Sequence, residues 1–187
     1  MSARAYGILL SIGGLLGFFA SFTLVLERLA VYANPDHVSK CDINPLFSCT
    51  SITQTWQASL FGFPNPLIGV VAFTVAIMLG ALIATGVKIP KWVHLGFLGG
   101  ITLGLVFILW LVSQAVFVIG LLCLYCMVVW AVVTVLFFAT LQHLLVEGHL
   151  LGWKSQESRE RLADWWWVGA AIVAMIISLL VVLQLVL

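Results

Sequence analysis

One stretch of this chain, from Trp92 to Val146, contains no aspartate, glutamate, lysine or arginine. A helix needs roughly 20 apolar residues to cross the ~30 Å hydrocarbon core of a bilayer. The stretch is too long for one span, and we expect it to fold back on itself around Ser113, Gln114 and Gly120. In the chain as a whole 63% of residues are hydrophobic and 8% are charged, which is too little polar surface to enclose a water-soluble domain. The sequence therefore predicts an all-α integral membrane protein.

Five apolar runs are long enough to span a bilayer. The first run follows Arg4, is longer than a signal-peptide core and lacks a clear small-residue cleavage site, so we interpret it as a retained helix. We expect one transmembrane domain over residues 1–187, with an outer loop over residues 30–65 and a cytoplasmic loop over residues 146–164. The predicted spans lie near residues 6–29, 66–87, 92–113, 123–145 and 165–187.

Positive residues near the span ends predict the orientation, because cytoplasmic loops are enriched in lysine and arginine. Arg28 and Lys40 fall on one side, which we assign to the outside of the cell membrane, and the N-terminus is then cytoplasmic. The tryptophans at 165–167 are expected at the cytoplasmic interface of the last span. A net charge of +1 offers no directed field for nucleic acid. The positive residues on the predicted cytoplasmic side are Arg4, Lys88, Lys91, Lys154, Arg159 and Arg161.

All four cysteines fall on the predicted outer side. Cys41 and Cys49 lie in the outer loop, and Cys123 and Cys126 form a Cys-Leu-Tyr-Cys motif at the start of the fourth span. Disulfides persist in oxidising compartments outside the cytoplasm, so this coincidence indicates thiol–disulfide chemistry. Residues three apart share a helix face, and a helix N-terminus favours the reactive thiolate. We expect Cys126 to lie one turn deeper than Cys123, where a lipid-soluble electron acceptor would lie.

Structural interpretations of the cysteines are the alternatives. One is a static disulfide between Cys41 and Cys49 together with two buried thiols, as in a membrane protein without enzymatic activity whose cysteines brace its outer surface. A zinc site is less favoured, because no histidine accompanies the helix pair and His37 is the one histidine on the predicted outer side.

The outer loop is too apolar to lie free in water. We expect a mobile linker over Ala33–Lys40, then a short helix that begins after Asn44 and runs over Pro45–Leu60. This half-helix would lie on the membrane surface as a cap over the bundle and place Cys49 near Cys123. Small residues at helical spacing, at 13, 14 and 17 and at 96, 99, 100 and 104, predict close helix contacts, which we expect within the bundle, with a dimer interface as the alternative.

The order of these motifs resembles the vitamin K epoxide reductase family over about residues 6–145. The motifs are Cys-x7-Cys in the first outer loop, Phe-Gly-Phe-Pro-Asn-Pro-Leu-Ile-Gly at residues 61–69, and Cys-Leu-Tyr-Cys at the start of a later span. Residues 56–66 are similar to stand-alone actinobacterial members, which lack the fused thioredoxin-like domain of other bacterial homologues. The resemblance implies a four-helix transmembrane bundle around a quinone pocket, to which this chain adds a fifth transmembrane helix.

The resemblance also implies a role for each cysteine. Cys41 and Cys49 match the family's loop shuttle cysteines, and Cys123 and Cys126 match the outer and inner cysteines of its redox motif. The implied enzyme reoxidises a secreted thioredoxin-fold protein of the DsbA type and reduces membrane quinone, with menaquinone preferred and no metal. Action on vitamin K epoxide is an alternative. A distinct family of quinone-dependent disulfide-forming enzymes is disfavoured, because it places Cys-x-x-Cys in the first outer loop.

Three further residues are implied as quinone contacts. Asn65 matches the family asparagine that hydrogen-bonds the quinone, and Thr55 stands where the family often has a hydroxyl residue. Trp130 stands where the vertebrate enzymes carry a tyrosine that contacts the quinone. An indole donates a hydrogen bond but accepts none, so the quinone pose in this chain is expected to differ.

Overall fold

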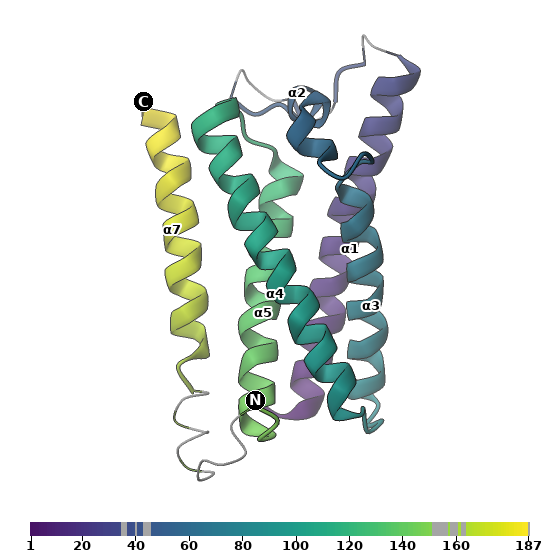
Figure 1. The fold of residues 1–187 in the computed structure, drawn as a ribbon, viewed down its shortest axis with the longest axis vertical. Coiled ribbons are helices and arrows are strands. Elements are labelled where there is room, and N and C mark those ends of the chain that lie inside the picture. Colours follow the sequence, from purple (N-terminus) through teal and green to yellow (C-terminus); the bar gives the residue numbers. More distant parts are fainter. Residues whose placement is uncertain are drawn as a thin grey trace.

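The structure is a computed structural model that describes residues 1–34, 37–39, 41–42, 46–150, 157, 161 and 164–186. Four long helices form a bundle, with a fifth helix beside it (Figure 1). This confirms the predicted all-α fold. The long helices are α1 (Ala3–Ala33), α3 (Pro66–Ala84), α4 (Lys91–Gln114) and α5 (Leu124–Val146), and the fifth is α7 (Trp166–Val186).

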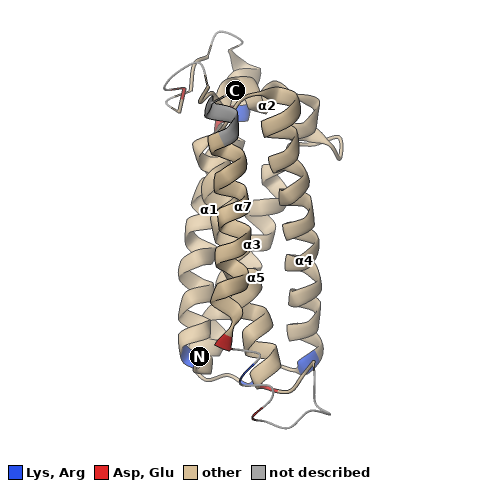
Figure 2. Ribbon diagram, turned by 90° about the vertical axis from the view of Figure 1, so that its left-hand side faces the viewer, with Lys and Arg blue, Asp and Glu red and all other residues tan. Residues whose placement is uncertain are grey.

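The four bundle helices are long and apolar enough to cross a bilayer, as expected of a multi-pass membrane protein. A helix satisfies all its backbone hydrogen bonds internally, which is why it is suited to hydrocarbon. The helix α7 is equally apolar in composition, and its crossing of a membrane stays a prediction. The charged residues lie near the two ends of the molecule, and the middle of the helices is nearly free of them (Figure 2). The orientation in the membrane also stays a prediction.

The helices pack unevenly. The helix α1 lies against α3 and α5, and α5 also contacts α4 and α7. In contrast, α3 and α4 make little direct contact, although the short segment between Ala84 and Lys91 joins them. The helices are therefore tightly packed around α1. The side of the bundle between α3 and α4, where packing is loose, is here called the loosely closed side.

Glycines explain the tight side. A Cβ built on Gly80 of α3 would lie 2.7 Å from the backbone oxygen of Gly7 in α1, and one on Gly14 would lie 2.8 Å from the side chain of Ile77. The prediction of close contacts at residues 13, 14 and 17 is confirmed. Packing of the α4 glycines within the bundle was predicted wrongly, because a Cβ on Gly96, Gly99, Gly100 or Gly104 would meet nothing within 4 Å. Their use in a dimer interface stays a prediction.

The reversal between α4 and α5 lies at Gly120, the last of the three residues around which it was predicted. Ser113 and Gln114 are helical, and the chain continues through one π-helical turn, η2 (Ala115–Ile119). The turn is made at Gly120, whose φ of 72° is a left-handed conformation that glycine adopts without strain. Ser113 does not break the helix because its hydroxyl donates to the carbonyl of Trp110 within the same helix.

Two short helices lie across one end of the bundle, here called the cysteine end (Figure 1). They are α2 (Cys49–Gln54) and η1 (Trp56–Ser59), separated at Thr55 by extended backbone. The predicted cap is thus present, but its helix begins at Cys49, where Ser48 is the N-cap and its hydroxyl accepts from Ser51 N at 3.1 Å. The predicted start at Asn44 and Pro45 lies outside the described residues.

The glycine contact between α1 and α3 gives a stability prediction. Gly80→Ala should lower the melting temperature in detergent, because its Cβ would lie 2.7 Å from the backbone at Gly7 and Ser11, and overpacking of this kind costs about 1–3 kcal/mol. Gly99→Ala is the matched control, since nothing lies near its Cβ and alanine favours a helix over glycine. Tryptophan fluorescence during heating measures both. Equal melting temperatures for the two variants would contradict the close packing.

Candidate functional site

Two segments far apart in the chain meet in one backbone pairing at the cysteine end. The N–H of Leu122 donates to the carbonyl of Leu46 at 2.8 Å, and the N–H of Ser48 donates to the carbonyl of Leu122 at 3.1 Å. These bonds form an isolated parallel bridge. Because Ser48 precedes Cys49 and Leu122 precedes Cys123, the bridge places these two cysteines side by side.

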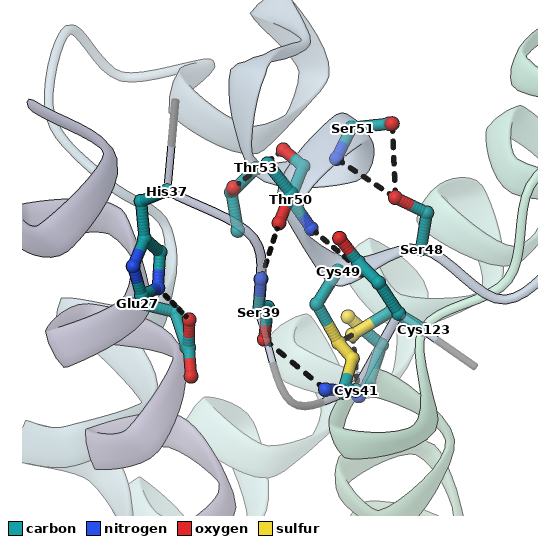
Figure 3. The surroundings of a disulfide bond; sticks show 12 residues. Glu27, His37, Ser39, Cys41, Ser48, Cys49, Thr50, Ser51, Thr53 and Cys123 are labelled. Atoms are coloured by element: carbon teal, nitrogen blue, oxygen red, sulfur yellow. Dashed lines mark hydrogen bonds and ion pairs between the residues drawn. A yellow bond between two sulfur atoms is a disulfide. The ribbon is translucent and has the colours of Figure 1, made fainter. Parts of the chain in front are cut away.

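Three sulfur atoms cluster next to this bridge (Figure 3). Cys41 and Cys49 form a disulfide with their Cα atoms 5.8 Å apart. The Sγ of Cys123 lies 3.2 Å from the Sγ of Cys49, which confirms the predicted closeness of these residues. All three are buried, with 4% exposure or less. A thiol in contact with a disulfide sulfur is positioned for thiol–disulfide exchange.

The fourth cysteine follows on the same helix. Cys123 is the N-cap of α5, and its Sγ accepts the backbone N–H of Cys126 at 3.4 Å. A hydrogen bond from the Cys126 side chain, helped by backbone N–H groups at the start of α5, lowers the pKa of Cys123 despite its burial and the nearby charge of Asp42. The start of the helix therefore favours a thiolate at Cys123, as expected. Cys126 itself is half-buried.

Asp42 is part of the site and was not singled out from the sequence. Its carboxylate accepts the backbone N–H of Thr50 at 3.2 Å, in the first turn of α2. Burial alone would raise the pKa of Asp42, but hydrogen bonds from Thr50, Cys49 and Ser48 outweigh it and lower the pKa. The ionised carboxylate thus joins the residue after Cys41 to the helix that carries Cys49.

The segment before Cys41 is also bonded to this helix. The N–H of Ser39 donates to the Thr50 hydroxyl at 3.0 Å, and the Ser39 hydroxyl accepts the N–H of Cys41 at 3.3 Å (Figure 3). The Nε2 of His37 lies within hydrogen-bond distance, 3.0 Å, of the Glu27 carboxylate of α1. The predicted mobile linker is therefore wrong for Ser39, which is 3% exposed. The rest of that prediction includes Pro35, Asp36 and Lys40, which lie outside the described residues.

A cavity of about 730 Å³ runs along the loosely closed side of the bundle, between α3, α4 and α5. This is a usual size for a small-molecule site. Its wall at the end away from the cysteines is apolar and includes Val93, Leu79 and Leu136. Its polar lining residues all come from the cysteine end and are Ser21, Thr53, Thr55, Gln57, Asn65, Cys123 and Cys126. The two cysteines of α5 therefore lie at the wall of a cavity suited to a long apolar molecule with a polar head.

Asn65 lies in this cavity wall and already has structural partners. Its amide Nδ2 donates to the carbonyl of Gln57 at 2.6 Å, and its Oδ1 accepts the N–H of Leu60 at 3.2 Å. These bonds hold η1 to the start of α3. An amide nitrogen carries two hydrogens, so one further donor is present for a ligand. Quinone contact by Asn65 stays a prediction.

The other two predicted quinone contacts also line the cavity. The Thr55 hydroxyl donates to the carbonyl of Ile52 at 2.8 Å, where it closes α2. Trp130 is 4% exposed and packs in the apolar core. One lining residue was missed, because Gln57 is buried at 4% exposure and its amide donates to Gln114 of α4 at 3.5 Å. In the sequence, Gln57 stands out only as a polar amide within an apolar loop. Residue spacing could not predict its partner Gln114, which is 57 residues away.

The sulfur geometry predicts which cysteines cross-link. In a Cys41→Ser/Cys126→Ser variant, mild oxidation should join Cys49 to Cys123, whose sulfur atoms are already in contact at 3.2 Å. Peptide mapping without reductant measures the bond. In the matched Cys41→Ser/Cys123→Ser variant the remaining cysteines should stay mostly unlinked. Equal linkage in both variants would contradict the arrangement.

Comparison with known proteins agrees with the site. The sequence pattern of the vitamin K epoxide reductase family matches residues 8–141, which run from Ile8 in α1 to Leu141 in α5 and include all four cysteines. No curated protein matches the chain. Because the family pattern covers most of the sequence, the chain belongs to the vitamin K epoxide reductase family.

Proposed function

We propose that this protein is a quinone-dependent thiol–disulfide oxidoreductase that reoxidises a secreted thioredoxin-fold protein of the DsbA type. Family membership supports an oxidoreductase. The observation that carries the proposal is the 3.2 Å contact between the sulfur atoms of Cys49 and Cys123, beside the cavity that Cys126 lines. Electrons entering at the loop disulfide would thereby have a route to an acceptor in the cavity.

The first step oxidises the partner protein. One partner thiolate attacks the Sγ of Cys41, which breaks the Cys41–Cys49 disulfide and releases Cys49 as a thiolate. The second partner thiolate then attacks the partner's own sulfur in the mixed disulfide and leaves Cys41 reduced. Cys41 is 4% exposed, so this step requires the segment around it to move outward when the partner docks.

The second step restores the loop disulfide. The Cys49 thiolate attacks Cys123 in a Cys123–Cys126 disulfide and displaces the Cys126 thiolate. The Cys41 thiolate then attacks Cys49, which re-forms the Cys41–Cys49 disulfide and releases Cys123. The products are an oxidised loop pair and a reduced helix pair, which is the pairing of the four cysteines in the structure.

The third step passes two electrons to the quinone. The Cys126 thiolate adds to a quinone held in the cavity, and Cys123 attacks the Sγ of Cys126, which forms their disulfide and expels the reduced ring. Two protons complete the quinol. The backbone N–H of Cys126 donates to the Cys123 sulfur at 3.4 Å, and this donor is still present in the adduct to stabilise the attacking Cys123 thiolate. A quinone with a potential well above that of the thiols draws the electrons forward, at about 1.4 kcal/mol for each 30 mV.

The setting of the reaction is part of the proposal. The protein would lie in the cell membrane with its N-terminus in the cytoplasm and its cysteines outside, where secreted proteins acquire disulfides. Menaquinone is the preferred acceptor, and no step requires a metal. Asn65 and Trp130 would donate hydrogen bonds to the quinone oxygens, with Thr55 nearby.

Two cysteine variants test the electron route. Cys126→Ser should lower the rate of quinone reduction to that of the uncatalysed reaction, because the sulfur that reacts with the quinone is lost. Cys41→Ser should retain activity with a small dithiol, which can reduce the helix pair directly, and lose activity with a thioredoxin-fold donor. Quinone absorbance measures both. Equal loss of activity with the two donors in Cys41→Ser would contradict the shuttle role, and full activity in Cys126→Ser would favour cysteines that only brace the protein.

A tryptophan pair tests the quinone contact. Trp130→Phe keeps an aromatic ring but loses the indole N–H, and the loss of about 1 kcal/mol of hydrogen bonding should raise the KM for quinone about fivefold. Trp110→Phe is the matched control, because Trp110 packs against Trp56 and Phe107 and does not line the cavity. An equal change in KM in both variants would show that Trp130 acts through packing alone.

A further inference from the structure

The sulfur cluster has a second chemical capacity that thiol exchange does not use. The Sγ atoms of Cys41, Cys49 and Cys123 all lie within 4.8 Å of one another, and the start of α5 brings Cys126 next to Cys123. Cysteine sulfurs around one tetrahedral Zn²⁺ lie about 2.3 Å from the ion and hence about 3.8 Å from each other. Once reduction has broken the Cys41–Cys49 bond, these sulfur atoms need only a small separation to reach the spacing of a metal–thiolate site.

We propose that the fully reduced protein captures one thiophilic cation of the Zn²⁺ type in this cluster, with the four cysteines as ligands, and that the Cys41–Cys49 disulfide excludes it. The cation would act as an inhibitor that holds the cysteines reduced, not as a cofactor. The binding of the cation does not depend on the proposed quinone chemistry, because it rests on the positions and redox state of the sulfur atoms. Its inhibitory effect rests on the proposed function.

The surroundings of the cluster favour a bound cation. Cys41, Cys49 and Cys123 are at most 4% exposed, so little water competes for the ion. The Asp42 carboxylate lies close enough to act electrostatically on Cys123, and it adds negative potential for a cation. The backbone N–H of Cys126 donates to the Cys123 sulfur and offsets part of the charge that several thiolates would bring together.

The redox state decides how many ligands exist. Thiolates bind Zn²⁺, and a sulfur committed to a disulfide is not a thiolate. With Cys41 and Cys49 joined, only Cys123 and Cys126 remain free, which is too few for a closed tetrahedral site. When the partner has reduced the loop pair and the helix pair has not been reoxidised, four thiols are present. Each thiol that binds the cation releases one proton, and no electron is transferred.

A bound cation would block both the oxidation of the partner protein and the reduction of quinone. A metal-bound Cys41 thiolate cannot be oxidised back to the disulfide that the partner needs, and a metal-bound Cys126 cannot add to a quinone. The protein would therefore be sensitive to zinc only while it lacks an electron acceptor, and a quinone-supplied protein would be protected because its helix pair stays oxidised.

The chain offers an internal control for this site. At the opposite end of the bundle the rings of His94 and His143 lie 5.5 Å apart, and those of His94 and His149 lie 5.7 Å apart, between centroids. Histidines are common ligands of the same cations. A His94→Ala/His143→Ala variant therefore separates binding by this group from binding by the cysteines.

The test uses Co²⁺ as a spectroscopic substitute for Zn²⁺. The full-length protein in detergent is reduced with a phosphine, desalted without oxygen, checked for four free thiols and titrated with Co²⁺. We expect one Co²⁺ per chain, with the sulfur-to-cobalt charge-transfer and visible bands of a tetrahedral thiolate site, and displacement by one Zn²⁺. The protein with its Cys41–Cys49 disulfide intact should give no such bands. Cys123→Ser should lose them, and the histidine variant should retain them.

Three results would overturn the inference. These are bands of equal strength in the disulfide form, loss of the bands in the histidine variant, and no thiolate bands in wild-type protein shown to hold four free thiols. The comparison of wild-type protein in two redox states needs no variant to fold. Because binding is read by absorbance without quinone or donor, and quinone reduction is measured with a chelator present, failure of either proposal leaves the other intact.

Discussion

The site depends on two backbone hydrogen bonds through Leu122, which join the segment before Cys49 to the segment before Cys123. The two cysteines are 74 residues apart in the chain, and this pairing is what aligns their sulfur atoms. Each such bond contributes only about 1 kcal/mol net. The alignment therefore needs support, which comes from the complete burial of Leu122 and from the caps at Ser48 and Cys123 that start the two helices at the cysteines.

The same arrangement explains why the cavity is polar at one end. The helices α1 and α3 approach closely through glycines, whereas the glycines of α4 meet no neighbour and leave space beside α3. This space continues to the bridge, where η1, held by Asn65, forms its wall. An apolar molecule entering along α4 would thus meet polar groups only near Cys126. The space left beside the glycines of α4 therefore extends to the polar end of the cavity, where Cys126 lies.

The sequence predicts the helices well because hydrocarbon leaves a backbone few other solutions. Apolar runs and flanking charges therefore locate α1, α3, α4 and α5, and the position of Cys123 at a helix start follows from them. The helical state of Ser113 and Gln114, the non-helical backbone of Phe47 and Ser48 before α2, and the glycine face of α4, which packs against nothing in the bundle, were predicted wrongly. In each case a local rule allowed two outcomes, and contacts with distant segments decided between them. Glycine spacing, for example, marks a smooth helix face without stating what lies opposite.

The neighbours of Cys49 favour a redox relay over a disulfide that only braces the fold. A disulfide that only braces a fold is best isolated from thiols, because an adjacent thiolate exchanges with it and scrambles the pairing. Here Cys123 lies 3.2 Å away, and hydrogen bonds that lower its pKa increase the fraction of attacking thiolate. The next cysteine on the same helix lines a large apolar cavity, where a bracing thiol would have no function. The arrangement therefore favours exchange, and it supports a path of electrons from the loop toward a molecule dissolved in lipid.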